Sequence, residues 1–206
     1  MSKAFSAFYD YLLPELPGCT PAYLDLQLLQ VARELCTRAQ CWRDTFPAIA
    51  SQDATLTYFL VTPAAKTELV RPLTLTVNAL LLWAAEDPPR CDENQPMFRA
   101  DEPPFSIDPA GTQITLNKQP TGDIVLTGVI RPALAATSLP DFLLNDLVDT
   151  LRAGVLSRLL VMPRKHWSNP VLGAFYTGEY TRLTHSAANK ARYDNTGRPL
   201  RTRIWG

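Results

Sequence analysis

The chain has 206 residues, of which 46% are hydrophobic and 19% are charged, so its composition is that of a folded protein and excludes an intrinsically disordered one. Twenty Lys and Arg residues balance twenty Asp and Glu residues, so the molecule as a whole has no net positive charge with which to bind nucleic acid or an anionic membrane. No stretch reaches the roughly 20 apolar residues that cross a bilayer and the start lacks a secretory pattern, so we expect folding in a cytoplasm without a membrane partner.

Residues 1–45 are expected to form helices. Residues 4–13 are a short apolar segment that Pro14 ends, because proline lacks a backbone N–H and clashes with the preceding turn. Thr20 is the predicted N-cap of the next helix, with Pro21 at its first position. One face of this helix carries the apolar residues Leu24, Leu28, Val31, Leu35, Ala39 and Trp42.

From residue 46 the hydrophobic period changes to two, which is typical of strands with one buried face. The predicted strands are residues 54–62, 73–81, 112–117 and 123–131. Proline and acidic residues crowd the stretch 86–104, which predicts a long exposed loop. Residues 46–137 together predict a small antiparallel β domain inserted between helices.

Helical periodicity returns at residue 138. Ser138 and Asp141 are spaced as a capping box, with Pro140 in the first turn. Apolar residues at helical spacing over residues 144–162 predict one continuous helix, which Pro163 ends.

A second helix is predicted to begin after Asn169, because Pro170 forces Asn169 out of the helical region and makes it a natural cap. The short loop between the two helices makes them antiparallel neighbours, so residues 138–193 form a helical hairpin. The expected fold class is therefore α+β: a bundle of long antiparallel helices with an inserted small antiparallel β domain and an extended C-terminal tail.

Residues 194–206 form the predicted extended basic tail. Turn-forming residues occupy 194–197, and the last nine residues have no helical period. The tail combines arginines, which can fork onto acidic groups, with apolar residues that can fill pockets, as interface hot spots do. The candidate binding residues, for a partner or a neighbouring copy, are Arg198, Leu200, Arg201, Arg203, Ile204 and Trp205.

Catalytic signatures are not found. His166 and His185 lie in no metal-binding or catalytic motif, and the four cysteines, Cys19, Cys36, Cys41 and Cys91, form no C-x-x-C pair and are expected to be reduced thiols. The acids Asp92, Glu93, Asp101 and Glu102 lack the ordered spacing of a calcium loop and the fixed separation of a glycosidase pair. We expect no catalytic residue, no metal site and no cofactor.

The segment 163–167 combines basic and aromatic residues, as nucleic-acid surfaces do. The segment is short, however, and the net charge is zero. A loop that joins two helices, with Trp167 filling the edge of the bundle, is favoured over a DNA contact.

Several segments carry a resemblance to a known family. They are LPDFL at 139–143, AGVLSRLLVMP at 153–163 and WSNP at 167–170, followed by a tyrosine-bearing helix, with LPELPGC at 13–19, ELC at 34–36 and CWR at 41–43. In combination, these segments resemble the two ends of tailed-bacteriophage head-to-tail adaptor (connector) proteins. The resemblance covers about half of the chain and departs from the family at 164–166, where a glycine-lysine pair is common.

The resemblance implies a non-enzymatic structural protein of the virion, located at the head-tail junction and made in the host cytoplasm. It implies a homo-oligomeric ring, usually of about twelve copies, that binds the portal protein above and tail or nozzle proteins below. DNA would pass through the lumen without sequence-specific binding. Four leucines off the main helical stripe are then expected to be buried against ring neighbours: Leu143, Leu147, Leu156 and Leu160.

Two alternatives stay open, and a third is disfavoured. The first is another virion structural part, such as a tail-tube or stopper protein, and the second is a virion-associated hydrolase that uses the acidic loop. The third, a carbohydrate-binding β module, would need more exposed aromatic residues than Trp83 and Phe98.

Overall fold

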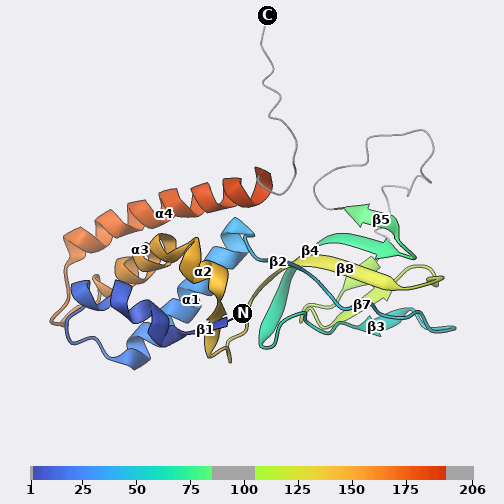
Figure 1. The fold of residues 1–206 in the computed structure, drawn as a ribbon, viewed down its shortest axis with the longest axis horizontal. Helices are drawn as coiled ribbons and strands as arrows, with labels where there is room; N and C mark the ends of the chain where they lie inside the picture. Colours follow the sequence, from blue (N-terminus) through green and yellow to red (C-terminus); the bar gives the residue numbers. More distant parts are fainter. Residues whose placement is uncertain (1, 85–104, 194–206) are drawn as a thin grey trace, which may run out of the picture. The chain divides into compact units, whose positions relative to one another are not determined.

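The computed structural model describes residues 2–84 and 105–193. In this part of the chain it has a mixed α+β fold with four α-helices, two 3₁₀-helices and nine strands (Figure 1). The chain divides into two compact units. The helical unit contains Met1–Cys41 and Thr137–Gly206, and the β unit contains Trp42–Ala136.

The helical unit begins with a short strand, β1 (Ser2–Ala4), which pairs antiparallel with β9 (Ser138–Pro140). Ser138 therefore lies opposite Ala4 in a ladder, and the predicted capping box at Ser138 is wrong. Helix α2 (Asp141–Asn145) instead has Pro140 at its N-cap, without a side-chain cap bond. Pairing between segments more than a hundred residues apart overrides the local capping pattern.

The helix predicted at 4–13 is instead a 3₁₀ helix, η1 (Phe5–Tyr11), and Pro14 does not end the helical segment but lies within a second 3₁₀ turn, η2 (Leu13–Glu15). Prolines at 14 and 17 leave a run too short to support an α-helix, and short runs often settle as 3₁₀ turns. Phe8 and Leu12 are still buried, each 1% exposed, so the apolar segment packs into the core as its sequence indicates.

Helix α1 (Pro21–Ala39) begins after Thr20, as predicted, although Thr20 makes no side-chain cap bond. Gln40 ends the helix in a left-handed conformation with φ of 50°. Trp42 therefore lies beyond the helix and belongs to the β unit, which corrects the predicted stripe at its last position. The rest of the stripe is buried: Leu24, Leu28, Val31, Leu35 and Ala39.

The continuous helix predicted for 144–162 is wrong, because the chain breaks between α2 and α3 (Val148–Leu159). The break falls at Asp146 and Leu147, next to Asn145. Asparagine and aspartate favour helix ends because their side chains compete for the backbone hydrogen bonds. The next helix, α4 (Pro170–Tyr193), begins as predicted: the backbone N–H of Leu172 donates to Oδ1 of Asn169 at 3.1 Å.

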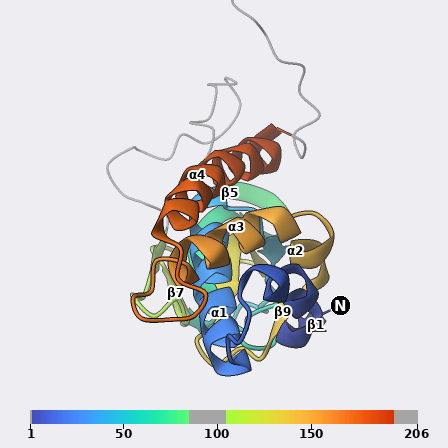
Figure 2. The same cartoon turned by 90° about the vertical axis from the view of Figure 1, so that its left-hand side faces the viewer.

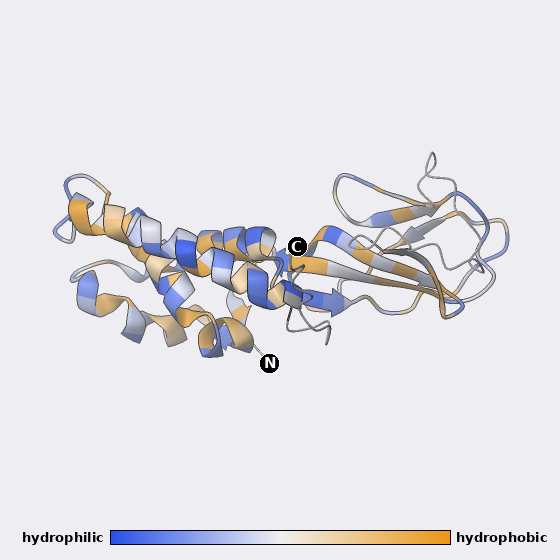
Figure 3. Ribbon diagram, turned by 90° about the horizontal axis from the view of Figure 1, so that it is seen from above, coloured by the Kyte–Doolittle hydropathy of each residue, from blue (hydrophilic) through white to orange (hydrophobic). Residues whose placement is uncertain are grey.

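Helices α1, α3 and α4 pack together, with α3 and α4 antiparallel across a short loop (Figure 2). Gly154 of α3 faces Val31 and Tyr180, and its missing side chain lets the three helices approach closely. Leu143, Leu156 and Leu160 are at most 1% exposed within the subunit itself. The expectation that these three leucines face ring neighbours is therefore wrong; they fill the core of their own unit. Figure 3 shows hydrophobic and hydrophilic residues alternating along these helices.

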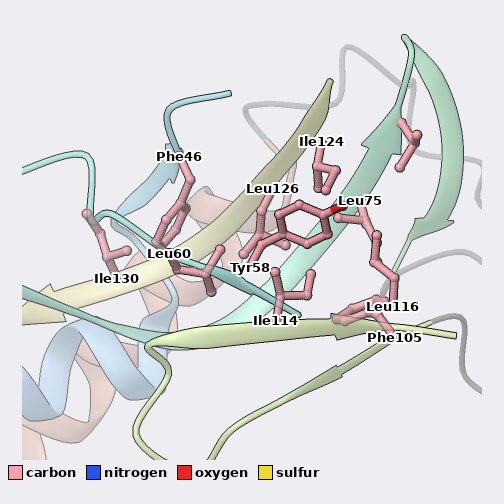
Figure 4. Close-up of a cluster of buried hydrophobic side chains, with 11 residues drawn as sticks. Phe46, Tyr58, Leu60, Leu75, Phe105, Ile114, Leu116, Ile124, Leu126 and Ile130 are labelled. Carbon is pink, nitrogen blue, oxygen red and sulfur yellow. The ribbon is translucent and has the colours of Figure 1, made fainter. Parts of the chain in front are cut away.

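The β unit contains two antiparallel sheets, with strand orders β2-β8-β4-β5 and β3-β7-β6. The strands are β2 (Arg43–Thr45), β3 (Thr57–Phe59), β4 (Thr67–Val77), β5 (Leu80–Ala84), β6 (Phe105–Ile107), β7 (Gln113–Leu116) and β8 (Ile124–Pro132). Side chains of both sheets meet in one apolar core, with Leu75 and Leu126 on one side and Tyr58 and Ile114 on the other (Figure 4).

The strands predicted at 54–62, 112–117 and 123–131 overlap β3, β7 and β8, whereas β2, β6 and the first half of β4 were not predicted. The single strand predicted at 73–81 is wrong. The stretch 73–81 is the end of β4, a turn at Asn78 and Ala79, and the start of β5. Both turn residues have positive φ, 50° and 61°, which a tight turn between strands requires. The buried face was predicted correctly: Leu73, Leu75 and Val77 are all at most 7% exposed.

Candidate functional site

The predicted binding residues of the tail, Arg198, Leu200, Arg201, Arg203, Ile204 and Trp205, lie outside the described residues. The predicted loop 86–104 lies outside them as well. The site is therefore built from α4, the helix that leads into the tail, and from the elements that hold this helix in place.

The inner face of α4 is buried against α1 and α3. Tyr180 and Ala187 are each 6% exposed, and the backbone carbonyl of Leu160 accepts a hydrogen bond from Asn169 just before α4 begins. This face of α4 is thus buried at Tyr180 and Ala187, and partly buried at Leu172, Tyr176 and Leu183.

A carboxylate ties the N-terminal segment to both C-terminal helices. Glu15 of η2 accepts hydrogen bonds from the Tyr176 hydroxyl at 2.7 and 2.8 Å and forms an ion pair with Arg152. The Arg152 guanidinium also lies 5.9 Å from the centre of the Tyr176 ring. Burial, together with the Glu15 carboxylate, raises the pKa of Tyr176, so its hydroxyl remains a donor.

A second carboxylate joins α1 to α3. Glu34 pairs with Arg158 of α3 and, at 2.9 Å, with Arg38 one turn along its own helix. Burial, followed by the nearby Glu34 charge, raises the pKa of Tyr180 to about 12. Within each cluster the charged groups are partly buried and paired with one another, which is the arrangement of structural bridges rather than of a reactive centre.

The basic-aromatic loop before α4 is held inside the helical unit. The ammonium of Lys165 lies 5.0 Å from the centre of the Tyr23 ring and 5.7 Å from that of Trp167. Trp167 is 8% exposed and meets Tyr23 edge-on at 6.5 Å. Lys165 and Trp167 are therefore used by the fold, which confirms the structural interpretation of Trp167 as a plug.

The remaining chemistry-bearing groups are scattered. The hydrogen bond with the Cys41 thiol, together with burial, holds the pKa of Cys36 well above its usual value, so this thiol stays protonated at neutral pH. His185 and Arg38 line a hollow of about 330 Å³ beside Thr184. Within residues 2–84 and 105–193 no group of three or more His, Cys, Asp and Glu side chains is placed to hold a metal ion. None of the described helices is long and apolar enough to cross a membrane.

The outer face of α4 carries a feature that sequence reasoning missed. Residues at helical spacing form what we call the outer stripe of α4: Val171, Phe175, Gly178, Arg182 and His185. Val171 is 84% exposed and Phe175 is 63% exposed. The signal was a glycine in the middle of a long helix, where it weakens the helix unless something outside the helix requires it.

The β unit has an exposed apolar edge of its own. Phe59 at the end of β3 is 72% exposed, and Val61 two residues later is 65% exposed. β3 is an outer strand of its sheet, and within residues 2–84 and 105–193 no further strand pairs with its other edge.

No family model matches the chain, and no curated protein matches it.

Proposed function

We propose that this protein is a structural subunit of a tailed-phage virion, a head-to-tail adaptor whose copies form a ring under the portal. The ring links the portal to tail or nozzle proteins and leaves a channel through which DNA passes without sequence-specific contact. In this proposal the helical unit is the long-helix bundle of an adaptor, and the β unit is its insertion. The protein has a structural rather than a catalytic role.

One observation carries the proposal. The segments that resemble adaptors lie at opposite ends of the chain, yet apart from Trp42 and Arg43 they belong to one folded unit. Glu15, within the N-terminal segment, bonds Arg152 and Tyr176 in the C-terminal half. Glu34 bonds Arg158 in the same way. The segments therefore act as parts of one helical platform, which is what a shared ancestor with adaptors would preserve.

Helix α4 ends at Tyr193, and the 13 residues that follow can carry the portal-binding function. An extended chain covers at most about 3.3 to 3.6 Å per residue, so this length reaches some 40 Å beyond the helix. Arg198, Arg201 and Arg203 can pair with acidic groups of the portal while Leu200, Ile204 and Trp205 fill its pockets. Arginines steer association, so docking should weaken as salt increases.

The test uses purified full-length protein with and without purified portal, examined by negative-stain electron microscopy and co-sedimentation. An adaptor gives rings stacked on the portal. A variant that lacks residues 198–206 should lose at least tenfold in portal affinity while its circular dichroism spectrum stays unchanged.

Unchanged portal binding by the truncated protein would remove the tail from the interface and leave the helices to hold the complex. No binding of the full-length protein to portal, together with hydrolysis of cell-wall or polysaccharide substrate, would overturn the proposal in favour of the hydrolase.

A further inference from the structure

We propose that the outer stripe of α4 is a contact surface for a second copy of this chain, and that it receives the acidic N-terminal surface of that copy, formed by Asp10, Tyr11 and Leu13. This inference rests on the proposed ring, and it assigns the two faces that join neighbours within the ring.

Gly178 is the first observation. A Cβ atom built at this position would meet nothing within 4 Å, so the packing of the subunit does not require glycine here. Gly154 differs, because its Cβ would clash with Val31 and Tyr180. Glycine in a helix interior costs about 1 kcal/mol relative to alanine. Glycine at this position destabilises the helix without a packing benefit inside the subunit, which indicates that another molecule approaches the α4 backbone at Gly178.

The side chains around Gly178 give the chemistry of the surface. On the N-terminal side lie Val171 and Phe175, which are 84% and 63% exposed. On the C-terminal side the stripe continues with His185 and with Arg182, whose guanidinium pairs with Glu179 of the same helix. The exposed basic residues Lys190 and Arg192 follow in the last turn of α4. An exposed apolar area followed by these basic residues fits a partner with exposed apolar residues next to acids.

The same subunit carries a surface of that kind. Tyr11 and Leu13 are 46% and 41% exposed, and the exposed Asp10 directly precedes Tyr11. Two more exposed carboxylates, Asp146 and Asp149, lie at the junction of α2 and α3, the elements against which β1 and η1 pack.

The two surfaces face different directions within the helical unit. In Figures 1 and 2 the dark-blue N-terminal segment lies on the other side of α3 from α4. A contact between two unlike faces of identical subunits is heterologous, and it closes into a ring when the rotation between copies allows it. Charge complementarity between the two faces selects a second copy as the occupant.

The first experiment fills the open position. In Gly178→Leu the new side chain has room within the monomer and improves helix propensity, so the melting temperature at low concentration should rise. The same side chain should block the neighbour and weaken self-association at least tenfold in analytical ultracentrifugation of the full-length chain. Thr177→Leu, which changes an exposed residue off the stripe, is the matched control and should associate as the wild type does.

The second experiment identifies the two faces. Phe175→Glu blocks the stripe, and the double variant Asp10→Lys, Tyr11→Lys blocks the N-terminal surface. Each variant alone should remain monomeric, whereas their equimolar mixture keeps one intact junction and should stop at a dimer. Melting curves of each variant confirm that it folds.

If Gly178→Leu self-associates as strongly as the wild type, or if the equimolar mixture stays monomeric, these two faces do not pair. A wild-type chain that stays monomeric at every accessible concentration also overturns this pairing. Portal co-sedimentation of the same variants separates the two proposals. A variant with a blocked stripe that still binds the portal has lost only the contact between neighbouring copies, so the proposed function would stand.

Discussion

Replacing Gly154 by alanine tests the close packing of α1, α3 and α4 most directly. The added Cβ would lie 2.5 Å from Cγ1 of Val31 and 2.9 Å from Cε2 of Tyr180. Neither neighbour can move easily, because Val31 is fully buried and branched at Cβ, and Tyr180 is 6% exposed.

Two opposing terms determine the size of the effect. Overpacking a well-filled core costs about 1–3 kcal/mol, and alanine returns about 1 kcal/mol of helix propensity. Because the added Cβ clashes with two rigid neighbours at once, the steric cost exceeds the gain in helix propensity. We expect the free energy of unfolding to fall by about 1–2 kcal/mol. Gly178→Ala is the matched control: it gains the propensity without any contact, so it should be about 1 kcal/mol more stable than the wild type.

The assay is urea unfolding followed by circular dichroism at helical wavelengths, at a concentration low enough to avoid self-association. The two variants should differ by about 2–3 kcal/mol, which corresponds to roughly 4–12 °C in melting temperature for a chain of this size. If Gly154→Ala were as stable as Gly178→Ala, the three helices would not meet at Gly154, and the packing described above would be incorrect.

Other substitutions test the bridges, the core and the loop. Glu15→Gln should lose about 1–3 kcal/mol of stability, less at high salt, because it removes the charge that Arg152 and Tyr176 share. If the Arg152→Met, Glu15→Gln double variant lost as much stability as the two single variants together, the two groups would not interact. Leu151→Ala, at a side chain 1% exposed, should cost about 2–5 kcal/mol, and a loss below about 0.5 kcal/mol would place it at the surface. Replacing Asp92, Glu93, Asp101 and Glu102 by Asn should shift the melting temperature by less than about 5 °C, and a larger drop would assign the loop a structural role.

Local patterns predicted the parts of the fold that depend on neighbours in sequence. A cap residue followed by proline located the starts of α1 and α4, since both signals act within a few residues. The alternation at Leu73, Leu75 and Val77 identified a buried strand face for the same reason. Errors arose where distant segments meet: Ser138 reads as a cap in sequence, but Ala4 offers it a ladder partner from the other end of the chain.

The candidate site follows the same division. The tail was selected by its composition, and this prediction lies beyond the described residues. The outer stripe was missed because an exposed glycine and a buried glycine read alike in sequence: Gly154 and Gly178 differ only in what surrounds them. The bridges of Glu15 and Glu34 were also beyond local reasoning, because each carboxylate finds its arginine more than a hundred residues away.

Tyr180 links the core packing to a pH dependence that can be measured. Burial and the Glu34 charge raise its pKa to about 12, above the value near 10 of an exposed tyrosine, so the folded state favours the protonated hydroxyl. The resulting stability is fully present below pH 10 and is lost as the pH rises through 12. With screening by solvent, we expect a loss on the order of 1–2 kcal/mol across this window.

In Tyr180→Phe the ring that packs on Gly154 remains, and a buried hydroxyl without a hydrogen-bond partner among the described residues is removed. This variant should therefore be at least as stable as the wild type at pH 7 and should show a shallower decline between pH 10 and 12 in urea titrations. A decline as steep as that of the wild type would assign the alkaline loss to other groups, and would mean that the Tyr180 hydroxyl is not held protonated by the junction of α1, α3 and α4.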